Sequence, residues 1–156
     1  VDVKTVSVTG SEMVGTSHGV TVKADMLFED ADFSDADLLM LPGGMPGSAT
    51  LDMHEGLHTV LAAHNSAGKL IGAICAAPMV LGRMGLLKAR RATCYPGFDK
   101  YLEGAEYTSE LVTVDGNIVT GKGPAATLPY AYRLLEMLEG AEKSREVAEG
   151  MGFFWR

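Results

Sequence analysis

The residue best suited to take part in a reaction is Cys75. It lies between an apolar run of strand length, residues 70–74, and a segment of helical character. A thiol at a sharp strand-to-helix turn is pushed out of the sheet, and the free N–H groups at the helix start favour its thiolate form. The small residues 76–77 let the two elements approach each other, and Pro78 suits a first helical turn. The pattern indicates a reactive cysteine, with an inert buried thiol as the open alternative.

Two glycine-containing loops follow apolar runs in the same way as Cys75 does. Residues 37–41 form a continuous apolar run that ends at Pro42-Gly43-Gly44, and residues 118–120 lead into a loop at 121–124. Such runs are typical of parallel strands that are buried on both faces. Because the chemistry of parallel sheets lies at the carboxyl ends of their strands, we expect these loops to lie near the cysteine.

The elements that must position these loops alternate between strands and helices. Strands are expected at 1–8, 20–23, 37–41, 70–74, 92–94, 111–114 and 118–120, and helices at 57–67, 78–84, 128–138 and 143–151. A hairpin is expected between the first two strands, and another around Asp115-Gly116-Asn117. This order predicts an α/β protein with a doubly wound, mostly parallel, flavodoxin-like sheet.

Length and composition favour one domain over residues 1–156. The hydrophobic content is 47%, and the net charge of −7 comes without any cluster of Lys and Arg, which excludes an ordinary nucleic-acid-binding surface. No apolar run reaches the roughly 18 residues of a membrane span. Two cysteines do not form a disulfide framework, so we expect a reducing cytoplasm as the location.

Other residues could do chemistry but are better explained by structure. His54-Glu55-Gly56-Leu57-His58 fits the zinc-protease pattern H-E-x-x-H, but Gly56 weakens the helix that the pattern needs and no third ligand follows. We therefore expect no metal. Cys94 lies in a strand pattern and is expected to be a core thiol. Lys122 could bind an anion or simply be a solvated loop lysine.

Four motifs in this order resemble the ThiJ/PfpI superfamily, the group of the parkinsonism-associated deglycase, within the class I glutamine amidotransferase-like folds. They are Leu-Pro-Gly-Gly at 41–44, Ala-Ile-Cys-Ala-Ala-Pro at 73–78, Asp-Gly-Asn at 115–117 and Thr-Gly-Lys-Gly-Pro at 120–124. The resemblance covers essentially the whole chain. Tyr95-Pro96, where other members have His-Pro, is similar to the bacterial ThiJ-like branch.

The resemblance implies a role for each matching residue. Cys75 matches the catalytic, easily oxidised cysteine, and the backbone N–H groups of Gly44 and Ala76 match the oxyanion-binding pair. His18 matches a position usually held by arginine near the site and the dimer interface. Gly43 and Tyr95 are also expected near the site, and Tyr95 replaces a histidine, so no imidazole base is offered there.

The resemblance also implies a strand and a helix before the segment that starts at Val1, with a glutamate that hydrogen-bonds the thiol. This sequence contains no residue at that position, so the domain is expected to be N-terminally incomplete. The implied protein is a homodimer and a cofactor-free glyoxalase or deglycase. It would act on methylglyoxal or on early glycation adducts.

Two alternatives remain open. The first is a redox sensor or stress chaperone in which Cys75 is oxidised and the same N–H groups hold the added oxygens. The second, weaker alternative is a cysteine peptidase or amidotransferase-like hydrolase. That chemistry needs a base beside the thiol, and no histidine follows Cys75 at a recognisable spacing.

Overall fold

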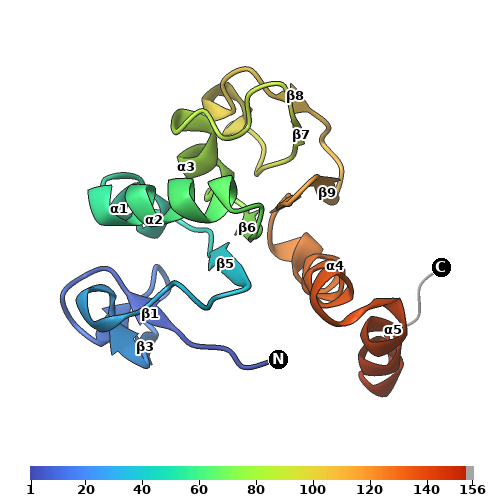
Figure 1. Ribbon diagram of the computed structural model, residues 1–156, viewed down its shortest axis with the longest axis horizontal. Helices are drawn as coiled ribbons and strands as arrows, with labels where there is room; N and C mark the ends of the chain where they lie inside the picture. The colour runs from blue at the N-terminus through green and yellow to red at the C-terminus, as the bar shows by residue number, and fades with distance from the viewer. Residues whose placement is uncertain (154–156) are drawn as a thin grey trace.

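A four-stranded sheet forms the centre of the molecule, whose computed structural model describes residues 1–153 (Figure 1). Its order is β5 (Leu38–Leu41), β6 (Leu70–Ile74), β10 (Ile118–Gly121) and β9 (Val112–Asp115). The first three strands are parallel, and β9 is antiparallel to β10 across the predicted Asp115-Gly116-Asn117 turn. The prediction of a mostly parallel α/β sheet is therefore confirmed.

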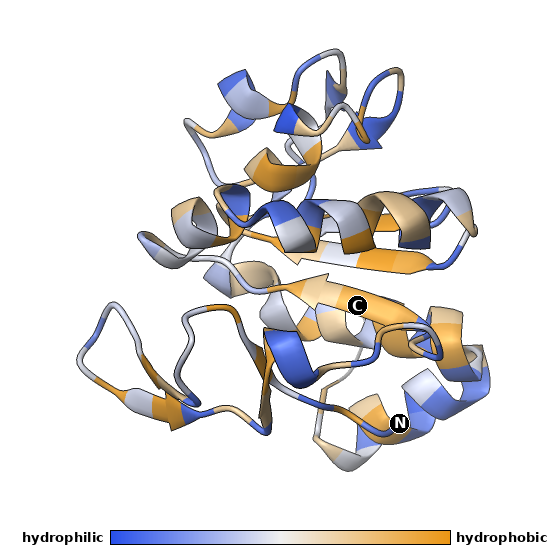
Figure 2. Cartoon of the chain, turned by 60° about the vertical axis from the view of Figure 1, so that its left-hand side comes forward, coloured by the Kyte–Doolittle hydropathy of each residue, from blue (hydrophilic) through white to orange (hydrophobic). Residues whose placement is uncertain are grey.

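Helices cover both faces of this sheet. On one face lie α1 (Gly47–Asp52), α2 (Glu55–Ser66) and α3 (Pro78–Arg83), and on the other lies α4 (Thr127–Glu139), which packs on α5 (Ala141–Gly150). Figure 2 shows hydrophobic residues concentrated on the central strands between these layers. The helices expected after residues 57, 78, 128 and 143 are present, whereas the short α1 was not predicted.

The side chains along each central strand point alternately to the two faces of the sheet, so the core has two parts. Leu41 and Ile71 pack with Leu61 of α2, and Val119 packs with Tyr130 of α4. Successive side chains of a strand point to opposite faces, so each central strand supplies both halves of the core. This explains why these strands appear in the sequence as unbroken apolar runs.

Three two-stranded pairs lie outside the central sheet. They are β1 (Val6–Ser7) with β4 (Met26–Leu27), β2 (Met13–Gly15) with β3 (Thr21–Lys23), and β7 (Arg91–Ala92) with β8 (Glu106–Tyr107). Short 3₁₀ turns occupy η1 (Phe28–Asp30), η2 (Asp99–Tyr101) and η3 (Pro124–Ala126).

The expected hairpin between residues 1–8 and 20–23 is wrong. β3 pairs with β2 instead, and β1 runs parallel to β4. The Thr16 N–H donates to the Val20 carbonyl over 2.8 Å, and Gly19 takes a φ of 75° in the turn. This tight turn closes a shorter loop than the predicted pairing would, at a lower entropic cost.

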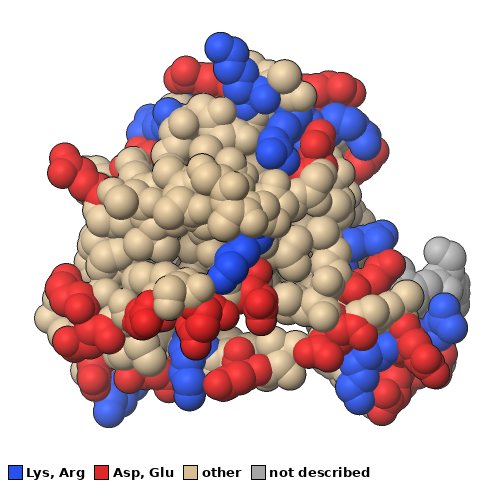
Figure 3. Space-filling model, in the orientation of Figure 1, with Lys and Arg blue, Asp and Glu red and all other residues tan. Residues whose placement is uncertain are grey.

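The surface matches the acidic composition. Acidic side chains gather over the N-terminal segment and over α5, while the centre of the visible face carries few charges (Figure 3). Within residues 1–153, none of the helices is long and apolar enough to cross a membrane.

Candidate functional site

Cys75 sits in the turn between β6 and α3, as the sequence predicts. Its φ is 65°, a left-handed backbone conformation that is uncommon for a residue with a side chain. The Ala77 N–H donates to the Ile74 carbonyl over 3.1 Å and closes the turn around it. The residue is half-buried and directly follows β6, at the carboxyl end of the sheet.

Two backbone hydrogen bonds fix Cys75 between neighbouring segments. Its N–H donates to the Gly121 carbonyl over 2.8 Å, and its carbonyl accepts from the Tyr95 N–H over 2.9 Å. The loops after β6 and β10 therefore meet at the cysteine, together with the segment that contains Tyr95. Tyr95 itself is 46% exposed.

Gly43 lies directly against Cys75. A Cβ at position 43 would overlap the Cβ of Cys75, and it would come within 2.5 Å of the Ile74 carbonyl oxygen and 3.3 Å of the Cys75 Sγ. No residue other than glycine fits there without movement of the turn. The loop after β5 thus joins the same site, as expected from the parallel sheet.

The N–H groups of Gly44 and Ala76 have no acceptor among residues 1–153. In the segment that follows Cys75, the N–H groups of Ala77 and Met79 donate to carbonyls within the turn, and Pro78 has no N–H. The Ala76 N–H is therefore the donor that remains available there. Gly44 has a φ of 95°, which glycine adopts at no steric cost. Unused donors beside a nucleophile can stabilise an oxyanion.

Cys94 differs from Cys75 in its burial. Its side chain is fully buried in the core, and this burial raises the pKa of its thiol to about 12, with smaller contributions from Asp99 and Cys75. At neutral pH the Cys94 thiol is protonated and unreactive. This agrees with the expectation of a core thiol.

His18 lies apart from the other predicted site residues, in the turn of the β2–β3 hairpin. It is exposed, and its Nδ1 shares a hydrogen bond of 3.0 Å with the Ser17 hydroxyl. In the part of the chain that the structure describes, no hydrogen bond joins it to Cys75, Gly44 or Tyr95. Its proposed role near the site stays a prediction from the resemblance.

The H-E-x-x-H pattern has a structural explanation. His54 precedes α2 and accepts the Leu57 N–H at its Nδ1 over 3.0 Å, and its ring packs on Phe28 with centroids 4.4 Å apart. His58 follows one turn later, and its buried Nε2 has no hydrogen-bond partner among residues 1–153. Residues 1–153 contain no group of three His, Cys, Asp or Glu that could hold a metal ion.

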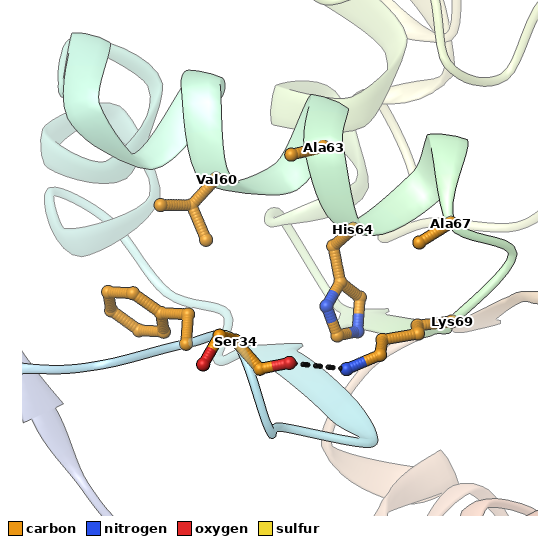
Figure 4. A pocket seen from close by; sticks show the side chains of 7 residues that line it. Ser34, Val60, Ala63, His64, Ala67 and Lys69 are labelled. Atoms are coloured by element: carbon orange, nitrogen blue, oxygen red, sulfur yellow. Dashed lines mark hydrogen bonds between the residues drawn. The ribbon is translucent and has the colours of Figure 1, made fainter.

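A pocket of about 250 Å³ lies between α2 and the loop before β5, at the far end of β6 from Cys75 (Figure 4). Its polar groups are occupied. His64 Nε2 lies 2.9 Å from the Leu70 carbonyl, and Lys69 Nζ donates to the carbonyls of Ser34 and Ala36. Burial lowers the pKa of His64, so its ring is neutral and structural.

The chain is similar in sequence and in structure to known proteins. A family model described as DJ-1/PfpI family matches residues 1–137. Protein DJ-1 homolog B of Arabidopsis thaliana is 40% identical over 94% of this chain, although the chain spans only 34% of that longer protein. A glutathione-independent glyoxalase of Caenorhabditis elegans is 34% identical, with 88% of this chain and 74% of that protein covered.

Other relatives extend the comparison to archaea and to solved structures. A deglycase of Pyrococcus horikoshii is 32% identical, with 78% of this chain and 74% of that protein covered. A DJ-1 superfamily protein of Salmonella typhimurium superposes with a TM-score of 0.91 at 34% identity, covering 99% of this chain and 85% of its own. An oxidized DJ-1 of Toxoplasma gondii gives 0.91 at 35% identity, covering 96% and 82%. The chain belongs to the DJ-1/PfpI family.

Proposed function

We propose that this protein is a Cys75-dependent, cofactor-free hydrolase that converts methylglyoxal, or the early adducts methylglyoxal forms on proteins and nucleotides, to hydroxy acids. The observation that carries the proposal is the left-handed turn at Cys75, which places a half-buried cysteine directly against Gly43. Relatives named as a glyoxalase and a deglycase support the same class of reaction.

The first step forms a carbon–sulfur bond. The Cys75 thiolate attacks the aldehyde carbon of methylglyoxal, and the carbonyl electron pair moves to oxygen, giving a hemithioacetal. The Gly44 and Ala76 N–H groups, which have no other acceptor in residues 1–153, are proposed to hold this oxygen.

The second step moves a proton from the former aldehyde carbon to the neighbouring ketone carbon. The first carbon is oxidised to a thioester while the second is reduced to an alcohol, so no external oxidant is needed. Water then cleaves the thioester, which releases lactate and returns the thiol.

This transfer requires an acid or base. In residues 1–153, the Cys75 sulfur has no hydrogen-bonded carboxylate or imidazole. The family resemblance gives this role to a glutamate from a helix that precedes the segment matching Val1.

The test measures lactate from methylglyoxal, without glutathione and with EDTA present. The native-length protein, with the segment that the resemblance places before Val1, and its Cys94→Ala variant are expected to produce lactate. The Cys75→Ala variant of the same protein is expected to lose the activity. Cys94→Ala is a matched control because it removes the other thiol of the same chain. Equal lactate from Cys75→Ala and the wild type would contradict the proposal.

Redox sensing is the second candidate, and the contrast between the two cysteines favours it. Cys75 is half-buried, while Cys94 is fully buried and stays protonated at neutral pH. Peroxide would oxidise the Cys75 sulfur to a sulfenic and then a sulfinic acid, with one peroxide reduced to water in each step. A sensor would gain these oxygens at Cys75 in peptide mass spectra and would produce no lactate from methylglyoxal.

We also infer a homodimer from the family resemblance. The β2–β3 hairpin that carries His18 exposes the apolar side chains of Met13, Val20 and Val22, which are 56%, 60% and 46% exposed. Contact with a second copy would remove this surface from water.

A further inference from the structure

A second hollow, the Tyr95 groove, lies beside the candidate site and has a volume of about 220 Å³. Its lining residues are Tyr95, Pro96, Leu111, Lys122, Gly123, Pro124, Ala125 and Ala126. Pockets for whole drug-sized ligands measure roughly 300–1,000 Å³. The groove therefore has room for one side group of a ligand rather than for a complete one.

Two of the segments that line the groove, those containing Tyr95 and Lys122, are connected to Cys75 by backbone hydrogen bonds. Tyr95 donates its N–H to the Cys75 carbonyl, and Gly121, which accepts the Cys75 N–H, directly precedes Lys122. Backbones joined in this way lie about 5 Å apart. The segments that carry Tyr95 and Lys122 are therefore direct neighbours of the Cys75 backbone, which places the groove next to the turn that contains the thiol.

The walls of the groove are apolar and fixed. Leu111 and Tyr95 are 51% and 46% exposed, so both would gain from contact with an apolar group. A Cβ at position 123 would lie 3.0 Å from Cδ2 of Tyr95, which shows that the ring rests against the Gly123 backbone. An aromatic or branched aliphatic group matches this lining.

Lys122 is the one charged residue in the lining. Its Nζ donates to the Ser109 carbonyl over 2.9 Å and is 3.0 Å from the Ser109 hydroxyl, which leaves one of its three N–H groups available. Within residues 1–153 it has no carboxylate partner, because the neighbouring Glu110 is paired with Arg91 over 3.1 Å. A cation without a fixed counter-ion, in an otherwise apolar groove, matches an anionic ligand.

We propose that the Tyr95 groove binds an apolar, carboxylate-bearing side group of the substrate, with Lys122 as its counter-ion. This inference rests on the proposed function for the reaction at Cys75. It assigns a preference to the site: aldehyde substrates with an aryl carboxylate are used better than their neutral analogues. The carboxylate takes no part in bond formation and only positions the substrate.

Binding is tested first, with a probe that cannot react. 4-Methylbenzoate and 4-methylbenzamide are titrated into the ¹⁵N-labelled protein, and amide shifts are followed. The expected result is amide shifts at Tyr95, Leu111, residues 122–123 and residues 125–126. The carboxylate is expected to bind about tenfold more tightly than the amide, a difference of about 1.4 kcal/mol. In Lys122→Met this difference is expected to disappear, while Lys88→Met, which changes an exposed lysine elsewhere, retains it.

Kinetics then connect the groove to the reaction. We expect kcat/KM for 4-carboxyphenylglyoxal to exceed that for phenylglyoxal about tenfold, and this ratio to fall to about one in Lys122→Met. Turnover of methylglyoxal, which has no carboxylate, is measured in each variant as the reference rate. Lys88→Met, at an exposed lysine outside the groove, should leave both this rate and the ratio of the two aryl substrates unchanged.

The outcomes separate the two proposals. Equal binding of 4-methylbenzoate and 4-methylbenzamide, or shifts confined to other residues, overturns the groove assignment. Selective binding with equal kcat/KM for the two aryl substrates overturns its role in substrate choice. Absence of any turnover, with selective binding intact, contradicts the proposed function but leaves the anion-binding groove supported.

Discussion

At the scale of single residues, the two cysteines differ in backbone conformation and in burial, and these differences control how reactive each thiol is. Cys75 has a left-handed φ of 65° and a half-buried side chain, whereas Cys94 is enclosed by the core. An unfavourable backbone conformation costs about 1–3 kcal/mol and must be maintained by its surroundings. Here Gly43, Tyr95 and Gly121 provide that support through close packing and two hydrogen bonds.

Gly43→Ala tests this support. The added Cβ would overlap the Cβ of Cys75, so the sulfur must move, and a displacement of about 1 Å typically costs about 100-fold in rate. We expect such a loss in methylglyoxal turnover. Gly47→Ala is the control, because nothing lies within 4 Å of its Cβ, and it should have wild-type activity. Equal activity in both variants would contradict close packing at Gly43.

The raised pKa of Cys94 predicts that the free energy of unfolding falls at alkaline pH. Its thiol has a pKa of about 12 in the folded state and an ordinary value near 9 when unfolded, so above pH 9 the unfolded state releases its proton first. Since the unfolded state then binds fewer protons, the free energy of unfolding falls as pH rises, by about 1.4 kcal/mol per pH unit between 9 and 12.

Urea denaturation at pH 8 to 11 measures this loss. The slope should be shallower in Cys94→Ala than in the wild type and unchanged in Cys75→Ala. An equal slope in Cys94→Ala would contradict the raised pKa.

At the scale of elements, the sequence predicts the central strands well and the peripheral ones poorly. The strand at 70–74, the hairpin at residues 115–117 and the helix after residue 128 are confirmed, because each is specified by its own apolar pattern or turn residues. The partners of β1 and β3 were predicted wrongly, since two- or three-residue strands carry almost no periodic signal.

The same distinction explains which parts of the site could be predicted. Cys75 and Gly43 lie at the ends of well-patterned strands, so their meeting follows from parallel sheet topology. The groove was not predicted, because it depends on how the Tyr95 ring rests on Gly123 and on the contact between Lys122 and Ser109. Such contacts join loops that are distant in sequence and leave no pattern in it.

Gly82 shows where tertiary packing overrides helix propensity. In an exposed helix, replacing glycine by alanine gains about 1 kcal/mol. At position 82 of α3, however, a Cβ would overlap the Tyr101 carbonyl and lie 2.9 Å from Cα of Leu102. We expect Gly82→Ala to lower the free energy of unfolding by about 1–3 kcal/mol.

Gly150→Ala in α5 provides the matched control, because nothing lies within 4 Å of its Cβ. It should be neutral or stabilising. Urea denaturation of the two variants measures the contrast, and a Gly82→Ala protein as stable as the wild type would refute the close packing of α3.

Tyr130 of α4 has a buried hydroxyl with no hydrogen-bond partner among the described residues, and burial raises its pKa. Leaving a buried donor unpaired costs about 1–3 kcal/mol, so Tyr130→Phe is expected to raise the free energy of unfolding by about 1 kcal/mol at pH 7. Above pH 10 the gain should increase, because the unfolded tyrosine ionises first. A loss of stability would show that the hydroxyl has a partner.

At the scale of the whole molecule, an α/β sheet brings three loops together at one edge and leaves the β2–β3 hairpin on the surface. If the hairpin forms the homodimer contact, a charge there should oppose assembly. Val20→Asp is expected to sediment as a monomer at concentrations where the wild type is a dimer. Val3→Asp changes another exposed valine and should remain dimeric. A wild-type protein that is monomeric throughout would rule out this assembly.

The most direct test of the central claim observes the bond between Cys75 and its substrate. The protein is mixed with methylglyoxal labelled with ¹³C at the aldehyde carbon and followed by NMR within a single turnover. The account predicts a hemithioacetal carbon signal that is present in the wild type and in Cys94→Ala and absent in Cys75→Ala. The same signal in Cys75→Ala, or lactate formation by that variant, would contradict it.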